Sequence, residues 1–422
     1  MNILKTTIAQ LREQRMLSAI SITGTALSIF LIMVVVISQE VKVAPFAPVS
    51  GRDRMLHARY GTIFVHDNGH YQSNGGMSWK SAHKLYDNLP GAEAMTVYTA
   101  WVRNANAKVP GKAPLGVGLR MVDDGYWKVF DHTFLSGKPF ATSDINSSHE
   151  IAIIDESTAL KLFGTKDAAG RQFELDYTPT TVAGVVRDVT TLADGAYSQL
   201  WIPYNKHKES TWNWGLMGSA SVTILAKDRD CFDDIRKAAD RNMEAYNKEI
   251  EETTWYFVSR GRPYTQEEDV EVNGSAVAEP DMSAARRNRL IIYAILLLVP
   301  AINLSSLTES RLRRRVEELG VRRAFGCTRS RLMGQLFGES MIVTLTGGVI
   351  GLILSVVYAF LFSSFLFGQG YGPAPLIDLD MLLHPSTFAI ALLFCFILNL
   401  LSIGIPAWKA TRTNIVNAIN KH

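Results

Sequence analysis

Four long apolar runs alternate with polar segments along the chain. The runs cover residues 17–38, 290–308, 341–367 and 387–408. The first contains no charged side chain and matches the roughly 20 residues that a spanning helix needs. The first, third and fourth are apolar enough to insert into a membrane unaided. The second is interrupted by Pro300 and Asn303 and is expected to depend on its neighbours.

The polar segment 39–288 has the pattern of a mixed α/β domain. Apolar and polar residues alternate over 62–66, which is typical of a strand, whereas residues 78–89 place their apolar side chains on one helical face. Further strands are expected over 95–102, 151–154, 181–186, 199–203 and 221–226, and helices over 156–163 and 231–248. Residues 273–280 are rich in turn-forming residues and suggest a mobile loop before the membrane. The predicted fold class is a membrane α-helical protein with four transmembrane helices and a large mixed α/β extracytoplasmic domain inserted between helices 1 and 2.

The distribution of positive charge predicts the orientation in the membrane. A group of arginines lies between the second and third runs: Arg311, Arg313, Arg314, Arg315, Arg322, Arg323, Arg329 and Arg331. Short loops rich in Lys and Arg stay on the cytoplasmic side. Segment 309–339 and both termini, including the tail 409–422, are therefore predicted to be cytoplasmic. Arg286, Arg287 and Arg289 oppose this orientation, but a long exported domain translocates largely regardless of such charge.

Several alternatives to this interpretation are disfavoured by the sequence. A cleaved signal peptide could replace the first span, but the run exceeds the ~7–15 apolar residues of such a peptide and no small-x-small cleavage site follows. The near-neutral net charge of +3 argues against a nucleic-acid-binding protein. Of the three cysteines only Cys231 lies in segment 39–288, so no intrachain disulfide is expected there.

The sequence predicts no catalytic residues, no cofactor and no metal site. It lacks the P-loop of ATPases, the G-x-S-x-G of hydrolases and the H-E-x-x-H of metalloproteases. His132, His149 and Asp144 show no ligand spacing and are expected to be structural. The pair Asp123 and Asp124 is interpreted as solvated loop or helix-start charges and not as a paired acid and base. No ionisable residue lies centrally in a span, which gives no support to a charged transport path.

Segment 309–339 has the features of a short cytoplasmic projection. Apolar residues, among them Val316 and Phe325, lie along one helical side, Gly326 is expected to end that helix, and Thr328 is expected to cap the next. Physical reasoning alone leaves open whether this projection docks a partner or lies against anionic lipid. Small residues in two of the spans, which are Gly24, Ser28, Gly347 and Gly351, are expected to allow close helix packing.

Residues 318–326 (ELGVRRAFG), with Gln335, Glu339 and the GGVIG run at 347–351, resemble the signature of the FtsX-like permeases. Residues 136–140 and 182–185 resemble the periplasmic core of MacB-type permeases. Cys327 departs from the alanine that is common in the family, and Asn414 from a frequent proline.

The resemblance implies a permease subunit of an ABC transporter of the mechanotransmission type, which couples ATP hydrolysis to movement of the periplasmic domains for export or efflux. The chain begins at its first helix, so the ATPase that is fused to MacB is expected to be a separate cytoplasmic subunit that binds the ATP. The ATPase-coupling residues would be Glu317, Glu318, Leu319, Gly320, Arg322, Arg323 and Gly326.

Other implied partners are a second permease, as a homodimer or a heterodimer with a sister chain, and membrane lipid. The resemblance leaves open a periplasmic adaptor and an outer-membrane channel. It implies a multi-pass protein of the cell inner (plasma) membrane. The alternative function is that of an FtsX-like non-transporting regulator, which activates an extracytoplasmic partner such as a cell-wall hydrolase. A membrane-anchored sensor without an ATPase partner is a third interpretation.

Overall fold

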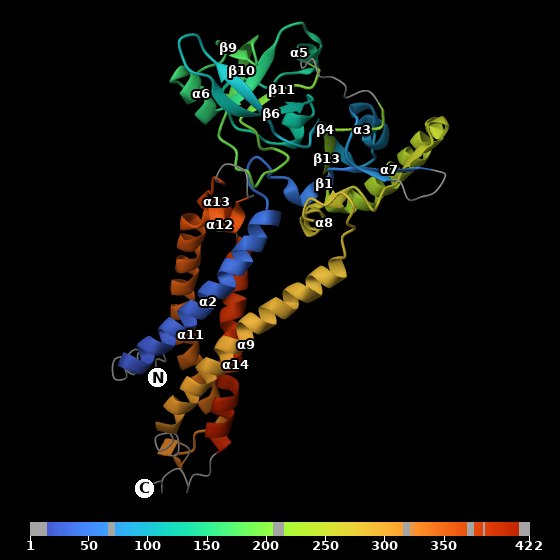
Figure 1. Cartoon of the computed structure of the whole chain (residues 1–422). Helices are drawn as coiled ribbons and strands as arrows, with labels where there is room; N and C mark the ends of the chain where they lie inside the picture. The colour runs from blue at the N-terminus through green and yellow to red at the C-terminus, as the bar shows by residue number, and fades with distance from the viewer. Residues whose placement is uncertain are drawn as a thin grey trace. The chain divides into compact units, whose positions relative to one another are not determined.

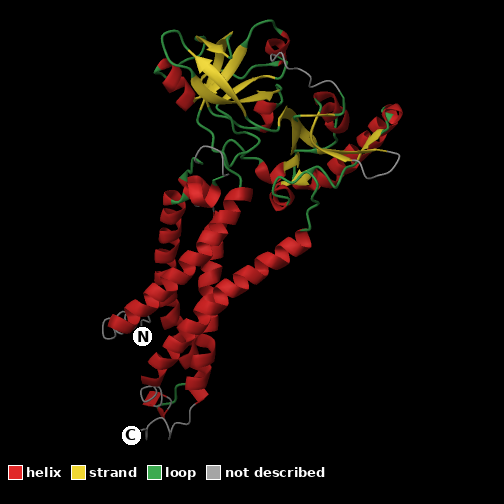
Figure 2. Ribbon diagram, in the orientation of Figure 1, coloured by secondary structure: helices red, strands yellow, loops and turns green. Residues whose placement is uncertain are grey.

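The computed structural model describes residues 15–65, 72–205, 215–314, 321–322, 324–368, 375–382 and 385–412. The chain divides into two compact units. We call the first, which contains Ser283–Gly368 and the helices at both ends of the chain, the helical unit. We call the second, which contains Lys42–Met282, the α/β unit. Figure 2 shows that the strands belong to the α/β unit and that the helical unit is built from long helices.

The helical unit contains six described helices. They are α2 (Arg15–Val43), α9 (Met282–Arg314), α11 (Arg329–Leu361), α12 (Ser363–Phe367), α13 (Leu379–Leu382) and α14 (Pro385–Arg412). Among the described residues, four of these helices are long and apolar enough to cross a membrane: Ser18–Val43, Met282–Ser310, Arg329–Leu361 and Pro385–Trp408. Within the unit α11 and α14 lie side by side (Figure 1). The predicted set of four apolar helices, one before the polar segment and three after it, is confirmed.

The second and third helices differ in extent from the apolar runs 290–308 and 341–367. Helix α9 continues through Pro300 and extends beyond both ends of its run. Leu297, Ala301 and Leu304, on either side of the proline, are buried in the bundle core, so neighbouring helices support this turn of the helix. Helix α11 starts at Arg329, well before its apolar run, and gives way to α12 at Phe362.

The bundle core is formed by one face of each of three helices. Its fully or nearly fully buried members are Ile29, Ile32, Met33 and Val36 of α2, Leu297, Ala301 and Leu304 of α9, and Ala391, Phe394, Cys395 and Leu398 of α14. The Ser386 hydroxyl donates a hydrogen bond of 2.9 Å to the Glu40 carboxylate, which joins the end of α2 to the start of α14. The opposite faces carry exposed Leu, Ile, Val and Phe side chains, the arrangement expected of helices that face lipid.

The α/β unit is built on one continuous mixed sheet. Its strands are β1 (Met55–Ala58), β2 (Gly61–Val65), β3 (Gln72–Met77), β4 (Ala92–Thr99), β5 (Arg103–Lys108), β6 (Leu115–Val122), β7 (Phe134–Gly137), β8 (Ile151–Asp155), β9 (Gln172–Leu175), β10 (Thr178–Val186), β11 (Leu200–Pro203), β12 (Met217–Gly218), β13 (Ala220–Ala226), β14 (Trp255–Phe257) and β15 (Tyr264–Thr265). The main path runs β11-β8-β10-β9-β5-β6-β4-β13-β3-β2-β14. The pairs β8–β10 and β6–β11 are parallel, and the other described pairs are antiparallel.

Helices cover hydrophobic cores along this sheet. The helices of the unit are α3 (Trp79–Tyr86), α4 (Tyr126–Val129), α5 (Thr142–Asn146), α6 (Glu156–Phe163), α7 (Phe232–Glu249) and α8 (Gln266–Glu271). Helix α3 packs against β4 and β13, α7 packs against α3 and β14, and α6 packs against β8 and β10 (Figure 1). Helix α6 is preceded by Asp155, whose carboxylate caps it by accepting from Thr158 N, and followed by Gly164 with φ +73°.

Candidate functional site

The segment that follows α9 ends in a glycine turn. Val321 and Arg322 are helical, and the last turn closes through hydrogen bonds from Phe325 N to Val321 O and from Cys327 N to Arg322 O, both 3.1 Å. Gly326 has φ +89°, a left-handed conformation in which a side chain would be strained. The Thr328 hydroxyl then caps α11 by accepting from Arg331 N. Of the predicted coupling residues, Glu317, Glu318, Leu319, Gly320 and Arg323 lie outside the described residues.

Arg322 is bonded within the chain and does not simply face solvent. Its Nη1 donates to Gln335 Oε1 at 3.0 Å, and Gln335 Nε2 donates to Glu339 Oε1 at 2.8 Å. Gln335 and Glu339 are one turn apart on α11, and Glu339 is buried. This relay fixes the turn at Gly326 to the first part of α11. The sequence placed Arg322 among the residues of a docking surface, but it did not reveal this internal contact.

An exposed apolar pair lies beside the relay. Val321 is 46 % exposed and Phe325, one helical turn later, is 89 % exposed. The same end of the bundle has its own small core of Leu312, Leu332, Leu336, Ile403 and Ala407. A phenylalanine left outside such a core, next to a rigid turn, has the character of an interface anchor.

Glycines of α11 bring its backbone against α2. A Cβ added at Gly347 would lie 2.8 Å from Thr25 Cβ and 3.0 Å from Ile22 O. One added at Gly351 would lie 2.5 Å from Ala26 O. These distances leave no room for a side chain, so the two helices approach through their backbones.

The predicted pair in α2 makes different contacts. A Cβ at Gly24 would meet only Leu304 Cδ2 of α9, at 3.9 Å. The Ser28 hydroxyl donates to Gly24 O at 2.7 Å within α2. Gly347 and Gly351 of α11 therefore do not pack on Gly24 and Ser28. They face neighbouring residues of α2, among them Thr25 and Ala26.

The polar side chains that the sequence flagged in the α/β unit are structural. His132 lies among aromatic rings, with centroids 5.3 Å from both Trp127 and Trp201, and burial of its ring nitrogens lowers its pKa to about 3. Asp123 is buried, so it is not a solvated loop charge, but its carboxylate accepts a hydrogen bond of 3.0 Å from Tyr126 N, the first residue of α4, as expected of a helix-start charge. Its carboxylate accepts hydrogen bonds from Thr96 Oγ1 at 2.6 Å and from Val97 N at 2.7 Å. Trp212 and Trp214, which the sequence offers either as an apolar contact surface for a ligand or as turn-packing side chains, lie outside the described residues.

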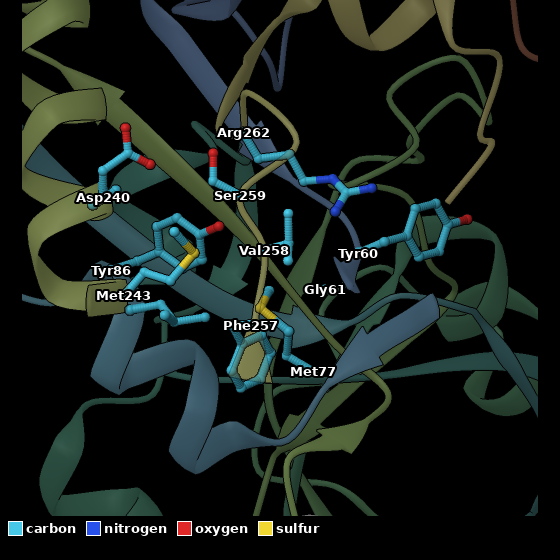
Figure 3. A pocket seen from close by; sticks show the side chains of 12 residues that line it. Tyr60, Gly61, Met77, Tyr86, Asp240, Met243, Phe257, Val258, Ser259 and Arg262 are labelled. Carbon is cyan, nitrogen blue, oxygen red and sulfur yellow. The ribbon is translucent and has the colours of Figure 1, made fainter. Parts of the chain in front are cut away.

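A small cavity lies in the α/β unit between α3, α7 and the strands β2 and β14. Its volume of about 20 Å³ is enough for about one water molecule. Tyr86, Asp240 and Met243 line one side, and Tyr60 and Arg262 line the other (Figure 3). Within the described ranges, no group of three or more His, Cys, Asp or Glu side chains could hold a metal ion. The cavity is too small for a transported organic molecule.

Comparison with known proteins gives two family matches that cover most of the chain. The model of the MacB-like periplasmic core domain matches residues 18–242, and that of the FtsX-like permease C-terminal region matches residues 290–415. The uncharacterized ABC transporter permease YknZ of Bacillus subtilis (strain 168) is 24% identical over 302 residues, which are 71% of this chain and 68% of YknZ.

The macrolide export ATP-binding/permease protein MacB of Escherichia coli (strain K12) is 24% identical over 306 residues, 71% of this chain and 42% of MacB. The chain thus spans less than half the length of MacB. The crystal structure of the periplasmic region of MacB from Actinobacillus actinomycetemcomitans aligns with a TM-score of 0.36 and 16% identity, over 54% of this chain and 96% of that one. Because the MacB-like model alone covers more than half of the chain, this protein belongs to the family of FtsX-like, MacB-type ABC transporter permeases.

Proposed function

We propose that this chain is the permease subunit of an ABC transporter that works by mechanotransmission. A separate ATPase subunit docks on the cytoplasmic turn at Gly326, and its ATP-driven movement passes through the helices to the α/β unit for export. In this proposal both termini are cytoplasmic and residues 39–288 are extracytoplasmic, in the inner (plasma) membrane. The observation that carries the proposal is the exposed Phe325 beside the Arg322–Gln335–Glu339 relay.

In this proposal the relay positions the turn, and the apolar pair Val321 and Phe325 contacts the ATPase. Because Arg322 is bonded to Gln335, it holds the turn in place. Phe325 and Val321 are free to be covered by a partner, since 89 % and 46 % of their surfaces are exposed. Burying one large apolar side chain stabilises a complex by about 1.5–3 kcal/mol. Phe325 can therefore account for about a tenfold to a hundredfold change in affinity.

Co-purification with the ATPase from native membranes tests the proposal. We expect Phe325→Ser to weaken recruitment by about tenfold to a hundredfold. Tyr177→Ser is the matched control, because Tyr177 is 96 % exposed on the α/β unit and its loss should leave recruitment unchanged. Equal recruitment by both variants would refute docking at Phe325. Recovery of no ATPase with the parent chain would refute the role as a transporter subunit.

The native cysteines test the orientation. A membrane-impermeant maleimide should label Cys231, which lies in the α/β unit, from outside the cell. Cys327, next to Gly326, should react only after the membrane is permeabilised. The reverse pattern would refute the proposed topology. Loss of the protein that left export intact but prevented cell separation would favour the regulator of a cell-wall hydrolase.

A further inference from the structure

The chain crosses from the α/β unit into α9 through a connector, residues 272–281, whose sequence suggests a mobile loop. Its backbone is instead folded on itself. Ser275 N donates to Val272 O at 2.9 Å, and the Ser275 hydroxyl accepts from Val277 N and Ala278 N at 3.3 and 3.0 Å. Asn273 and Gly274 form a turn with φ +47° and +73°. The connector is therefore a compact, hydrogen-bonded structure.

Two arginines of one tight turn hold this connector. Arg262 Nη2 donates to Ala276 O at 2.6 Å, and Arg260 Nη1 donates to Val277 O at 3.0 Å and to Glu279 Oε1 at 3.4 Å. Both side chains come from the turn between β14 and β15 and reach residues that precede the first residue of α9, Met282, by only a few positions. We call Arg260 and Arg262, with these three partners, the arginine clamp.

The clamp is anchored to the sheet on its other side. Arg262 Nη1 donates to Thr62 Oγ1 of β2 at 3.1 Å. Arg260 Nη2 donates to Gln72 Oε1 of β3 at 3.0 Å, and its guanidinium lies 5.7 Å from the centre of the Phe64 ring. Each arginine thus links the connector to a strand near the β14 edge of the sheet. A pull on the connector is carried by side chains that are bonded at both ends.

Arg262 makes the clamp strong because it is buried. Only 4 % of its surface is exposed, and among the residues that the structure describes no carboxylate forms an ion pair with it. Burial also lowers the pKa of the Arg262 guanidinium, because the charged form is disfavoured away from water. A buried cation that gave up the Ala276 carbonyl would lose a charge-assisted hydrogen bond without water to replace it, and such losses are costly.

The other crossing of the chain, after α2, is held in a similar way. Gln266 Nε2 of α8 donates to Lys42 O at 2.9 Å, and Arg52 Nη1 donates to Ala44 O at 3.2 Å. Backbone carbonyls on both crossings are thus gripped by side chains of the α/β unit.

We propose that Arg260 and Arg262 are positioning residues that transmit the movement of α9 to the α/β unit. This inference rests on the proposed function. The grip lies at residues 276–279, so the path of force bypasses the turn at Asn273 and Gly274. Flexibility introduced before the grip is therefore harmless, whereas flexibility introduced between the grip and α9 uncouples the movement.

The test places the same Gly-Ser-Gly insertion at two positions of the full chain, purified with its ATPase. One insertion lies between Asn273 and Gly274, upstream of the clamp, and the other between Asp281 and Met282, downstream of it. Spin labels at Tyr177→Cys and Leu290→Cys, in a chain whose native cysteines are serine, report the distance between the α/β unit and α9. The readout is the change of this distance on adding ATP and vanadate.

We expect the upstream insertion to keep the parental change and the downstream insertion to lose at least half of it, with equal ATPase recovery in both. Arg260→Ala, at a side chain that is partly exposed, should behave like the downstream insertion, and Arg262→Lys should reduce the change less than Arg262→Met. A downstream insertion that moves like the parent overturns the clamp, and so does an upstream insertion that abolishes movement. Failure of the parent to recover an ATPase counts against the proposed function instead.

Discussion

Replacement of Gly351 by alanine should open the helix bundle. The added Cβ would lie 2.5 Å from Ala26 O and 3.0 Å from Ile29 Cβ of α2. A backbone oxygen cannot rotate away as a side chain can, so α2 and α11 must separate. Overpacking of this kind costs about 1–3 kcal/mol. Alanine itself favours a helix over glycine by about 1 kcal/mol, which offsets part of the cost.

Gly334→Ala is the matched control in the same helix. A Cβ at Gly334 has nothing within 4 Å, so only the gain in helix propensity of about 1 kcal/mol remains. Because the propensity gain is common to both variants and cancels, they should differ by the overpacking cost alone, about 1–3 kcal/mol in the stability of the bundle. A difference of 2 kcal/mol corresponds to about a 30-fold change in the population of opened bundles.

Cys395 offers a reporter of this opening. Its side chain is buried in the bundle core, 3 % exposed. With Cys231 and Cys327 replaced by serine, the rate at which a thiol-reactive dye labels Cys395 in detergent measures the opened population. We expect Gly351→Ala to label about 10- to 100-fold faster than Gly334→Ala. Equal rates would refute the close approach of α2 and α11.

Three further outcomes are expected. Both ring nitrogens of His132 are buried, and its pKa in the folded chain is about 3, against 6.5 in the unfolded chain. Between these two values only the unfolded chain takes up the proton. The free energy of unfolding should therefore fall by about 1.4 kcal/mol for each unit by which the pH is lowered. From pH 7 to 5 the parent should lose about 2 kcal/mol more than His132→Phe in urea unfolding followed by tryptophan fluorescence; parallel profiles would contradict this. Gln335→Leu should raise protease cleavage near Arg322, because it removes both hydrogen bonds of the relay, and unchanged cleavage would exclude the relay. Thr328→Ala should cost about 1 kcal/mol at the start of α11, seen as about fivefold faster hydrogen exchange of its first turn, and no change would mean that the cap is dispensable.

The sequence could predict the features that depend on local or periodic patterns. The apolar runs give the four membrane helices because hydrophobicity alone selects them. Gly326 and Thr328 were predicted as a helix stop and a cap because both roles depend on neighbours in the chain. The α11 glycines were predicted as packing residues from their spacing, but the spacing could not show which residues of α2 they meet.

The features that escaped prediction depend on distant partners. Asp123 looks like a loop charge, and its burial follows from donors on β4 that only the folded sheet brings near. Gln335 lies 13 residues from Arg322, on the other side of a glycine turn. The arginine clamp grips main-chain carbonyls, which every residue possesses, so no sequence pattern could mark Ala276 or Val277 as its targets.

The clamp has a geometric consequence for α9. A helix turns by about 100° for each residue, so the number of residues between Glu279 and Met282 fixes the azimuth at which α9 starts. Deleting one residue there would rotate the stripe of Leu297, Ala301 and Leu304 by more than a quarter of a circle. Under the proposed coupling the chain would then keep either the grip or the register of the bundle core, but not both, so the length of this short stretch is expected to matter as much as its composition.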